Sequence, residues 1–191
     1  VKDFYALTEQ NTIKLSPDGE YISCLRLREG VMNLYTQHLG NGTVYRVSRN
    51  DSLPVHDYSW VNDSVLVFTA DTGRGLAPRL TAAGRTGYWL NFLTSPGGNS
   101  RLIDGMPLSD SLIIAGSDPA GGESFHAIRI NVYTGTTVTV GENNGSIIDW
   151  IADHTGSVRV AVSSDGSNNA VLYRDSEKDV FALLITLPFT E

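Results

Sequence analysis

The stretch IKLSPDGEYISCLR, residues 13–26, decides the fold. A short apolar run leads into the turn Ser16-Pro17-Asp18-Gly19, and a strand with alternating apolar and polar residues follows from Tyr21. Pro, Asp and Gly in succession are typical of a tight turn, and alternation with a period of two is typical of a half-buried strand. The segment therefore predicts an antiparallel hairpin.

The same pattern recurs three more times along the chain. The further copies are YSWVNDSVLVFTA (58–70), MPLSDSLIIAG (106–116) and DWIADHTGSVRVAV (149–162). Their turn aspartates, counted from Asp18 through Asp63 and Asp110 to Asp153, lie 45, 47 and 43 residues apart. A period of about 40–50 residues fits one four-stranded blade of a β-propeller.

A second hairpin follows in each period, as in NLYTQHLGNGTVYRV (33–47) and FHAIRINVYTGTTVTV (125–140). Two hairpins per period give four strands, and no segment shows a sustained helical period. The sequence predicts an all-β fold with about four propeller blades, at residues 8–52, 53–104, 105–145 and 146–187. Because propellers have about four to eight blades, a segment of a seven- or eight-bladed ring is favoured over a closed four-bladed one.

The second copy has a longer interval between its turns. Asp63 precedes Gly98, the glycine assigned to the second turn, by 35 residues, whereas the interval is 24 and 25 residues in the first and third copies. About ten extra residues near 71–87 are therefore expected as an exposed loop, and long loops are often functional. Arginine binds carboxylates through a bidentate fork. The binding candidates are Arg74, Arg79 and Arg85, and a solvated loop without function is the alternative.

Composition excludes several classes of protein. The formal net charge is −7, from 14 Lys+Arg and 21 Asp+Glu, which argues against a nucleic-acid or anionic-membrane partner. The longest apolar run, residues 180–189, is too short to span a bilayer. Cys24 is the single cysteine, so no intrachain disulfide forms.

No catalytic, cofactor-binding or metal-ligating residue is predicted. A serine hydrolase of the α/β type holds its nucleophile in a Gly-x-Ser-x-Gly turn, and no serine of this chain has that context. The four histidines lack the short spacings of a metal site. The chain alone is therefore not expected to hydrolyse peptides.

Several of these stretches resemble a known family. The Ser16–Gly19 turn with its following strand resembles TolB-like and dipeptidyl-peptidase-like propeller blades. Further segments resemble, in order, the N-terminal propeller of prolyl-oligopeptidase-family serine peptidases: LRLREG with NLY (25–35), YSW (58–60), FTAD (68–71), DWIAD (149–153) and VAVSSDG with LYR (160–174).

The resemblance implies a non-catalytic role. In that family the propeller precedes an α/β-hydrolase domain with a Ser-Asp-His triad and restricts which peptides reach it. This chain would then be the propeller part, with the hydrolase domain and the peptide substrate as its partners and with uncovered blade edges that favour self-association. A periplasmic or secreted location is favoured over a cytoplasmic one. The alternative is a TolB-like binding scaffold with no enzyme attached.

Overall fold

The computed structural model describes residues 10–49, 51–73, 78–95, 98–106 and 108–188, and of Gln10 and Asn11 only the backbone. Within those residues the chain forms sixteen β-strands and no helix. The strands are β1 (Gln10–Leu15), β2 (Tyr21–Arg28), β3 (Val31–His38), β4 (Val44–Arg46), β5 (Val55–Trp60), β6 (Val65–Ala70), β7 (Arg79–Gly84), β8 (Leu90–Phe92), β9 (Asn99–Asp104), β10 (Leu112–Asp118), β11 (His126–Asn131), β12 (Thr137–Gly141), β13 (Ile147–Ala152), β14 (Val158–Ser164), β15 (Asn168–Tyr173) and β16 (Ala182–Pro188).

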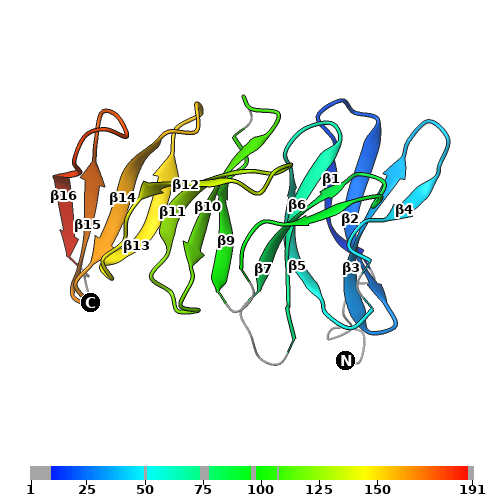
Figure 1. The fold of residues 1–191 in the computed structure, drawn as a ribbon, viewed down its shortest axis with the longest axis horizontal. Helices are drawn as coiled ribbons and strands as arrows, with labels where there is room; N and C mark the ends of the chain where they lie inside the picture. Colours follow the sequence, from blue (N-terminus) through cyan, green and yellow to red (C-terminus); the bar gives the residue numbers. More distant parts are fainter. Residues whose placement is uncertain (1–9, 50, 74–77, 96–97, 107, 189–191) are drawn as a thin grey trace.

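Four consecutive strands make each sheet. The strand orders are β1-β2-β3-β4, β5-β6-β7-β8, β9-β10-β11-β12 and β13-β14-β15-β16, and the pairs are antiparallel. Figure 1 shows the sheets side by side in chain order, from the blue first sheet to the red strand of the fourth. These are four blades of a β-propeller, which confirms the predicted fold class.

The second strand of an inner blade is apolar on both faces because it packs against two neighbours. In β6, Leu66 and Phe68 belong to a buried cluster shared with the first sheet. The alternate residues Val65 and Val67 belong to a cluster shared with the third sheet. A continuous apolar run in one strand therefore serves two separate cores.

A third cluster joins the third and fourth blades. Ile114 of β10 packs there with Val140, Trp150 and Val158, each at most 9% exposed. Trp60 and Trp150 both pack between blades. The Trp60 indole N–H donates to Ser23 Oγ of the first sheet at 2.8 Å, and the Trp150 N–H donates to Phe125 O of the third at 2.7 Å.

The boundary between the second and third blades lies earlier than the predicted 104/105. Strand β9 pairs with β10, so residues 99–104 belong to the third sheet. In the alignment of the four repeats, the apolar Met106 stands where the first strand of a blade is expected. Met106 instead lies in the turn between β9 and β10 with a φ of 48°, and its buried side chain joins the third cluster.

The predicted exposed loop at 71–87 is largely wrong, because residues 79–84 form the buried strand β7. Ala and Gly make up half of this strand and Thr81 is its single β-branched residue, so its sequence has little of the β-branched and aromatic character that usually marks a strand. The turn after it places Gly87, not Gly98, at the position of Gly42 and Gly135. All three have φ between 67° and 72°. Gly87 follows Asp63 by 24 residues, which restores the interval of the other copies.

None of the described residues forms a helix long and apolar enough to cross a membrane.

Gly87 is expected to be among the most sensitive glycines. A Cβ there would lie 2.5 Å from Arg46 O of the preceding sheet, and the φ of 67° is unfavourable for an L-residue. Gly87→Ala should lower the free energy of unfolding by about 3 kcal/mol or more, measured by urea denaturation. Gly19→Ala is the matched control, since its φ is 72° but no atom lies within 4 Å, and it should cost only about 1 kcal/mol. Equal losses in the two variants would show that close approach to the neighbouring sheet is unimportant.

Candidate functional site

Arg85 was expected in an exposed loop. The structure instead places it between the first and second blades, which it connects. It follows β7, and its Nη1 donates to Asp18 Oδ2 at 2.8 Å and to Asp63 O at 2.9 Å. Its guanidinium also lies over the Tyr21 ring, 4.2 Å from the centroid. With these partners, Arg85 serves the junction between the first and second blades.

Asp18 of the opening motif therefore has two tasks. Its Oδ1 accepts from Ser16 Oγ at 2.6 Å and from the Glu20 amide at 3.0 Å, which closes its own turn. Its Oδ2 takes the Arg85 contact from the next blade. The Ser16 hydroxyl, the Glu20 amide and then Arg85 lower the pKa of Asp18 below its usual 3.8. The turn and the junction thus depend on the same ionised carboxylate.

The turn between the third and fourth strands reaches back onto the preceding blade at each junction. In the third blade, the Tyr133 hydroxyl meets Asn62 Nδ2 at 3.0 Å. In the fourth, Glu177 Oε1 accepts from Arg129 Nη2 at 2.6 Å. Arg85, Tyr133 and Glu177 thus occupy equivalent turns in the second, third and fourth blades, although their side chains differ.

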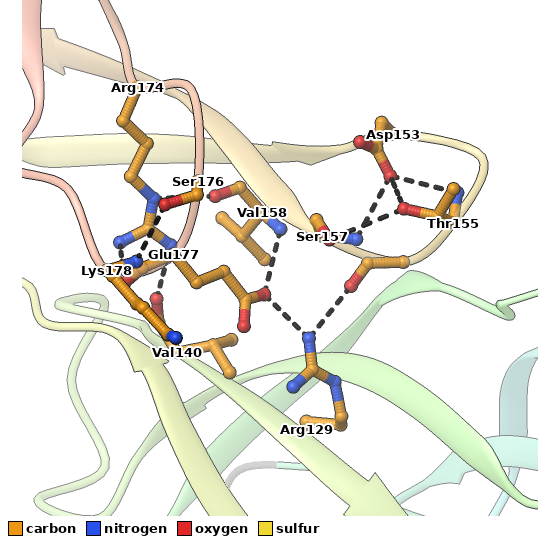
Figure 2. Close-up of polar contacts among 11 residues, drawn as sticks. Arg129, Val140, Asp153, Thr155, Ser157, Val158, Arg174, Ser176, Glu177 and Lys178 are labelled. Atoms are coloured by element: carbon orange, nitrogen blue, oxygen red, sulfur yellow. Dashed lines mark hydrogen bonds and ion pairs between the residues drawn. The ribbon is translucent and has the colours of Figure 1, made fainter.

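Arg174 completes the last junction (Figure 2). Its side chain is buried, and it donates to Val158 O at 2.8 Å, to Val140 O of the third sheet at 2.6 Å and to Glu177 O at 3.3 Å. Its guanidinium also lies over the Phe181 ring, 4.3 Å from the centroid. Burial lowers the pKa of Arg174. Here an arginine is held by backbone carbonyls, a role that the sequence analysis did not foresee.

Sequence reasoning missed Arg174 and Glu177 because their partners are distant in the chain. Residues 175–179 have the composition of a solvated hairpin tip. The only available signal was position, since Glu177 follows Asp153 by 24 residues, the interval that separates Asp18 from Gly42.

Arg79 has a different environment from Arg85. It begins β7, and its guanidinium carbon lies 3.8 Å from the centroid of the Phe92 ring of β8. It lines a cavity of about 240 Å³ near the junction of the first two blades, together with Arg49 and the apolar side chains of Leu53 and Leu90. Of the three predicted candidates, Arg79 is therefore the one that the structure places in the lining of this cavity.

Within the described part of the chain, no carboxylate forms an ion pair with Arg49 or Arg79. Asp71 lines the same cavity, but its Oδ1 contacts His56 Nε2 at 2.6 Å. The cavity thus combines an apolar wall with two cations whose charges are not neutralised by direct contact.

Arg74, the remaining candidate, lies outside the described residues. A second cavity of about 210 Å³ lies between the second and third blades and includes His56 and Arg101. Arg101 is already paired, since its Nη2 donates to Asp149 Oδ1 at 2.9 Å. Among the described residues, no group of three His, Cys, Asp or Glu side chains is placed to hold a metal ion.

Comparisons with known proteins agree with the resemblance seen in the sequence. No family model matches the chain. Dipeptidyl aminopeptidase BIII from Pseudoxanthomonas mexicana is 20% identical over 186 residues, which are 96% of this chain and 27% of that protein. The chain therefore spans about a quarter of the length of this curated relative.

Solved structures show the same fold. Prolyl oligopeptidase B from Galerina marginata matches with a TM-score of 0.65 and 11% identity, over 93% of this chain and 27% of that one. TolB from Acinetobacter baumannii matches with a TM-score of 0.60 and 18% identity, over 95% of this chain and 44% of that one. The chain is thus similar both to propellers of peptidases and to a TolB propeller.

Removal of the Arg174 guanidinium should destabilise the protein at the junction between the third and fourth blades. Arg174→Met keeps the apolar stem but leaves the Val140 and Val158 carbonyls without their donors. We expect the free energy of unfolding to fall by about 3 kcal/mol, measured by urea denaturation. Arg28→Met, at an arginine whose side chain is 52% exposed, is the control and should stay within about 0.5 kcal/mol of the parent. A similar loss in both variants would contradict the assigned role of Arg174.

Acid should remove the contribution that ionised Asp18 makes to stability. Because its pKa is lowered in the folded state, ionised Asp18 stabilises the fold above pH 3.8, and this stability is lost as the pH falls through the folded-state pKa. Asp18→Asn should therefore be less stable than the parent at pH 7, and the gap should close in stronger acid. Urea unfolding between pH 2 and pH 7 (roughly the range over which carboxylates titrate) measures the gap. A gap independent of pH would contradict the role of the charge.

Proposed function

We propose that this chain is the propeller part of a prolyl-oligopeptidase-family serine peptidase and that it restricts peptide access to a hydrolase domain outside these 191 residues. The observation that carries the proposal is the match to a dipeptidyl aminopeptidase, which extends over 96% of the chain. The match to the propeller of a prolyl oligopeptidase supports the same assignment at the level of fold.

The chemistry of the chain favours this division of labour. No serine has the context of a nucleophile turn, and the polar contacts of Asp18, Arg85, Arg129 and Arg174 are made within and between blades. These residues hold blades together, which suits a wall that excludes large substrates. Bond cleavage is assigned to the Ser-Asp-His triad of the hydrolase domain.

The two end blades favour a larger ring. The first sheet exposes Ile13 (67%) and Leu15 (59%), and the last sheet exposes Leu183 (64%) and Leu187 (50%). Between neighbouring sheets of this chain, apolar faces of this kind are covered by the next blade. We assign the uncovered faces to further blades of a seven- or eight-bladed propeller, and in their absence to self-association. An extracytoplasmic location accompanies this proposal.

A TolB-like binding scaffold is the second candidate. TolB from Acinetobacter baumannii matches 95% of the chain with a TM-score close to that of the peptidase propeller. A scaffold would use the same blades with no hydrolase domain. The two functions therefore differ in whether the full-length polypeptide contains a hydrolase domain and in whether it has a reactive serine nucleophile.

Fluorophosphonate labelling of the full-length gene product distinguishes the two functions. We expect covalent labelling of the full-length protein, loss of labelling when the serine of its Gly-x-Ser-x-Gly turn is changed to Ala, and no labelling of the 191-residue chain. Release of dipeptides or short peptides by the labelled protein would identify it as a peptidase. A full-length protein that contains no such turn, does not label and cleaves no peptide would refute the peptidase and leave the scaffold.

A further inference from the structure

We propose that the cavity between Arg49, Arg79 and Phe92 is a binding site for a free carboxylate carried beside an apolar side chain, as at the C-terminus of a peptide. We name it the Arg79 pocket, with Leu53, Leu90 and Phe68 as further lining residues. The proposal concerns the chain's own surface and does not depend on whether a hydrolase domain follows.

The stacking of Arg79 prepares it for an anion. The Phe92 ring, 3.8 Å from the guanidinium carbon, covers one face of the group and restricts its orientation. The N–H donors of a guanidinium lie in its plane, so a stacked arginine can still present a bidentate fork to a carboxylate. Because Arg79 makes no ion pair within the described residues, binding need not break an existing one.

Arg49 adds a second cation from the opposite blade. It directly follows Ser48, whose hydroxyl donates to Asn33 Oδ1 at 2.8 Å and accepts from the Leu34 amide at 3.2 Å. Arg49 itself has a φ of 49°, which is unfavourable for a residue with a side chain. Such conformations persist only where their surroundings impose them, and they concentrate at binding sites. The anchored Ser48 fixes the point from which the Arg49 side chain begins.

The wall of the pocket is apolar and partly solvent-exposed. Both apolar residues belong to β8, the strand at the edge of the second sheet. Phe92 is 58% exposed there and Leu90 is 38% exposed. An apolar group laid against them would lose contact with water, which is favourable by about 25 cal/mol per Å². The pocket therefore favours binding of a ligand that carries an anionic group next to an apolar one.

The size of the pocket limits the ligand. Its volume of about 240 Å³ is below the range of about 300–1,000 Å³ that is usual for drug-sized molecules. One residue of a peptide can enter, and a longer segment cannot be enclosed. Two arginines against the single carboxylate of Asp71 also favour an anion over a cation.

The test compares N-acetyl-phenylalanine with N-acetyl-phenylalaninamide, which differ only in the carboxylate. Binding to the 191-residue chain is followed by amide chemical shifts in ¹H–¹⁵N spectra. We expect the acid to bind with a dissociation constant on the order of 1 mM and to shift the amides of residues 49, 79 and 92. The amide should bind at least tenfold more weakly, and so should acetate, which lacks the apolar group.

Variants locate the site. Arg79→Gln and Arg49→Gln should each weaken binding of the acid about tenfold, the size of one lost charge-assisted contact, and Arg79→Lys should recover only part of the loss because lysine lacks the planar fork. Phe92→Leu keeps the apolar wall but removes the stacking, and it should weaken binding several-fold. Lys178→Gln carries the same charge change on the exposed turn between β15 and β16 of the fourth blade, outside the pocket, and should bind like the parent. The dispersion of each spectrum reports whether the variant is folded.

Three results would overturn the proposal. The first is equal binding of the acid and the amide, which would show that the carboxylate does not contribute to affinity. The second is unchanged affinity in folded Arg79→Gln and Arg49→Gln. The third is a set of shifts confined to another surface. If Arg79→Gln does not fold, the exposed Arg49 and Phe92 positions still decide the outcome.

Discussion

The structure depends on the burial of both faces of a blade against its neighbours. In β6 the side chains of Val65 and Leu66, adjacent in sequence, enter different apolar clusters, and neither cluster is complete within one sheet. A blade removed from the stack would expose both faces to water, at a cost proportional to the apolar area. Stability in such a repeat arises mainly at interfaces between consecutive units, so the order of the blades along the chain is also the order of the packing.

Polar contacts at the turns fix how neighbouring blades meet. Arg85 reaches Asp18, Tyr133 reaches Asn62, and Glu177 reaches Arg129, each from a turn onto the preceding blade. These contacts need only proximity and complementary chemistry, so the residue types differ while the position repeats. The same logic explains why Arg85, which the sequence analysis took for a ligand-binding candidate, serves the fold. Arg79 is the exception, because its guanidinium meets an aromatic ring and an open pocket in place of a carboxylate.

Errors in the sequence analysis occurred where composition and structure disagree. The long interval from Asp63 to Gly98 indicated a loop, and the Ala and Gly residues of 79–84 gave no strand signal against it. These residues nevertheless form the buried strand β7, because Ala82 packs in the cluster shared with the third sheet and Ala83 in the cluster shared with the first. Small residues are needed where Trp89 packs, since a Cβ on Gly84 would lie 2.8 Å from its Nε1. Residues 99–104, largely polar, likewise form the first strand of the third sheet, which moved a blade boundary. In both cases the reason lies in pairing and packing with other segments, which the stretch itself does not show.

The sequence by itself determined the class of fold, the period and the number of blades, because turn chemistry and the two-residue period of strands are local properties. It also indicated the similarity to peptidase and TolB-like propellers. Tertiary structure alone decided which arginine joins blades and which lines a pocket. Arg79 and Arg85 are six residues apart in similar local sequence, but Asp18 and Phe92 lie in different sheets and give one arginine a carboxylate and the other an aromatic ring. The Asp18–Arg85 pair depends on how two sheets stack, and the Arg79–Phe92 contact depends on the pairing of β7 with β8, so neither can be read from the residues beside each arginine.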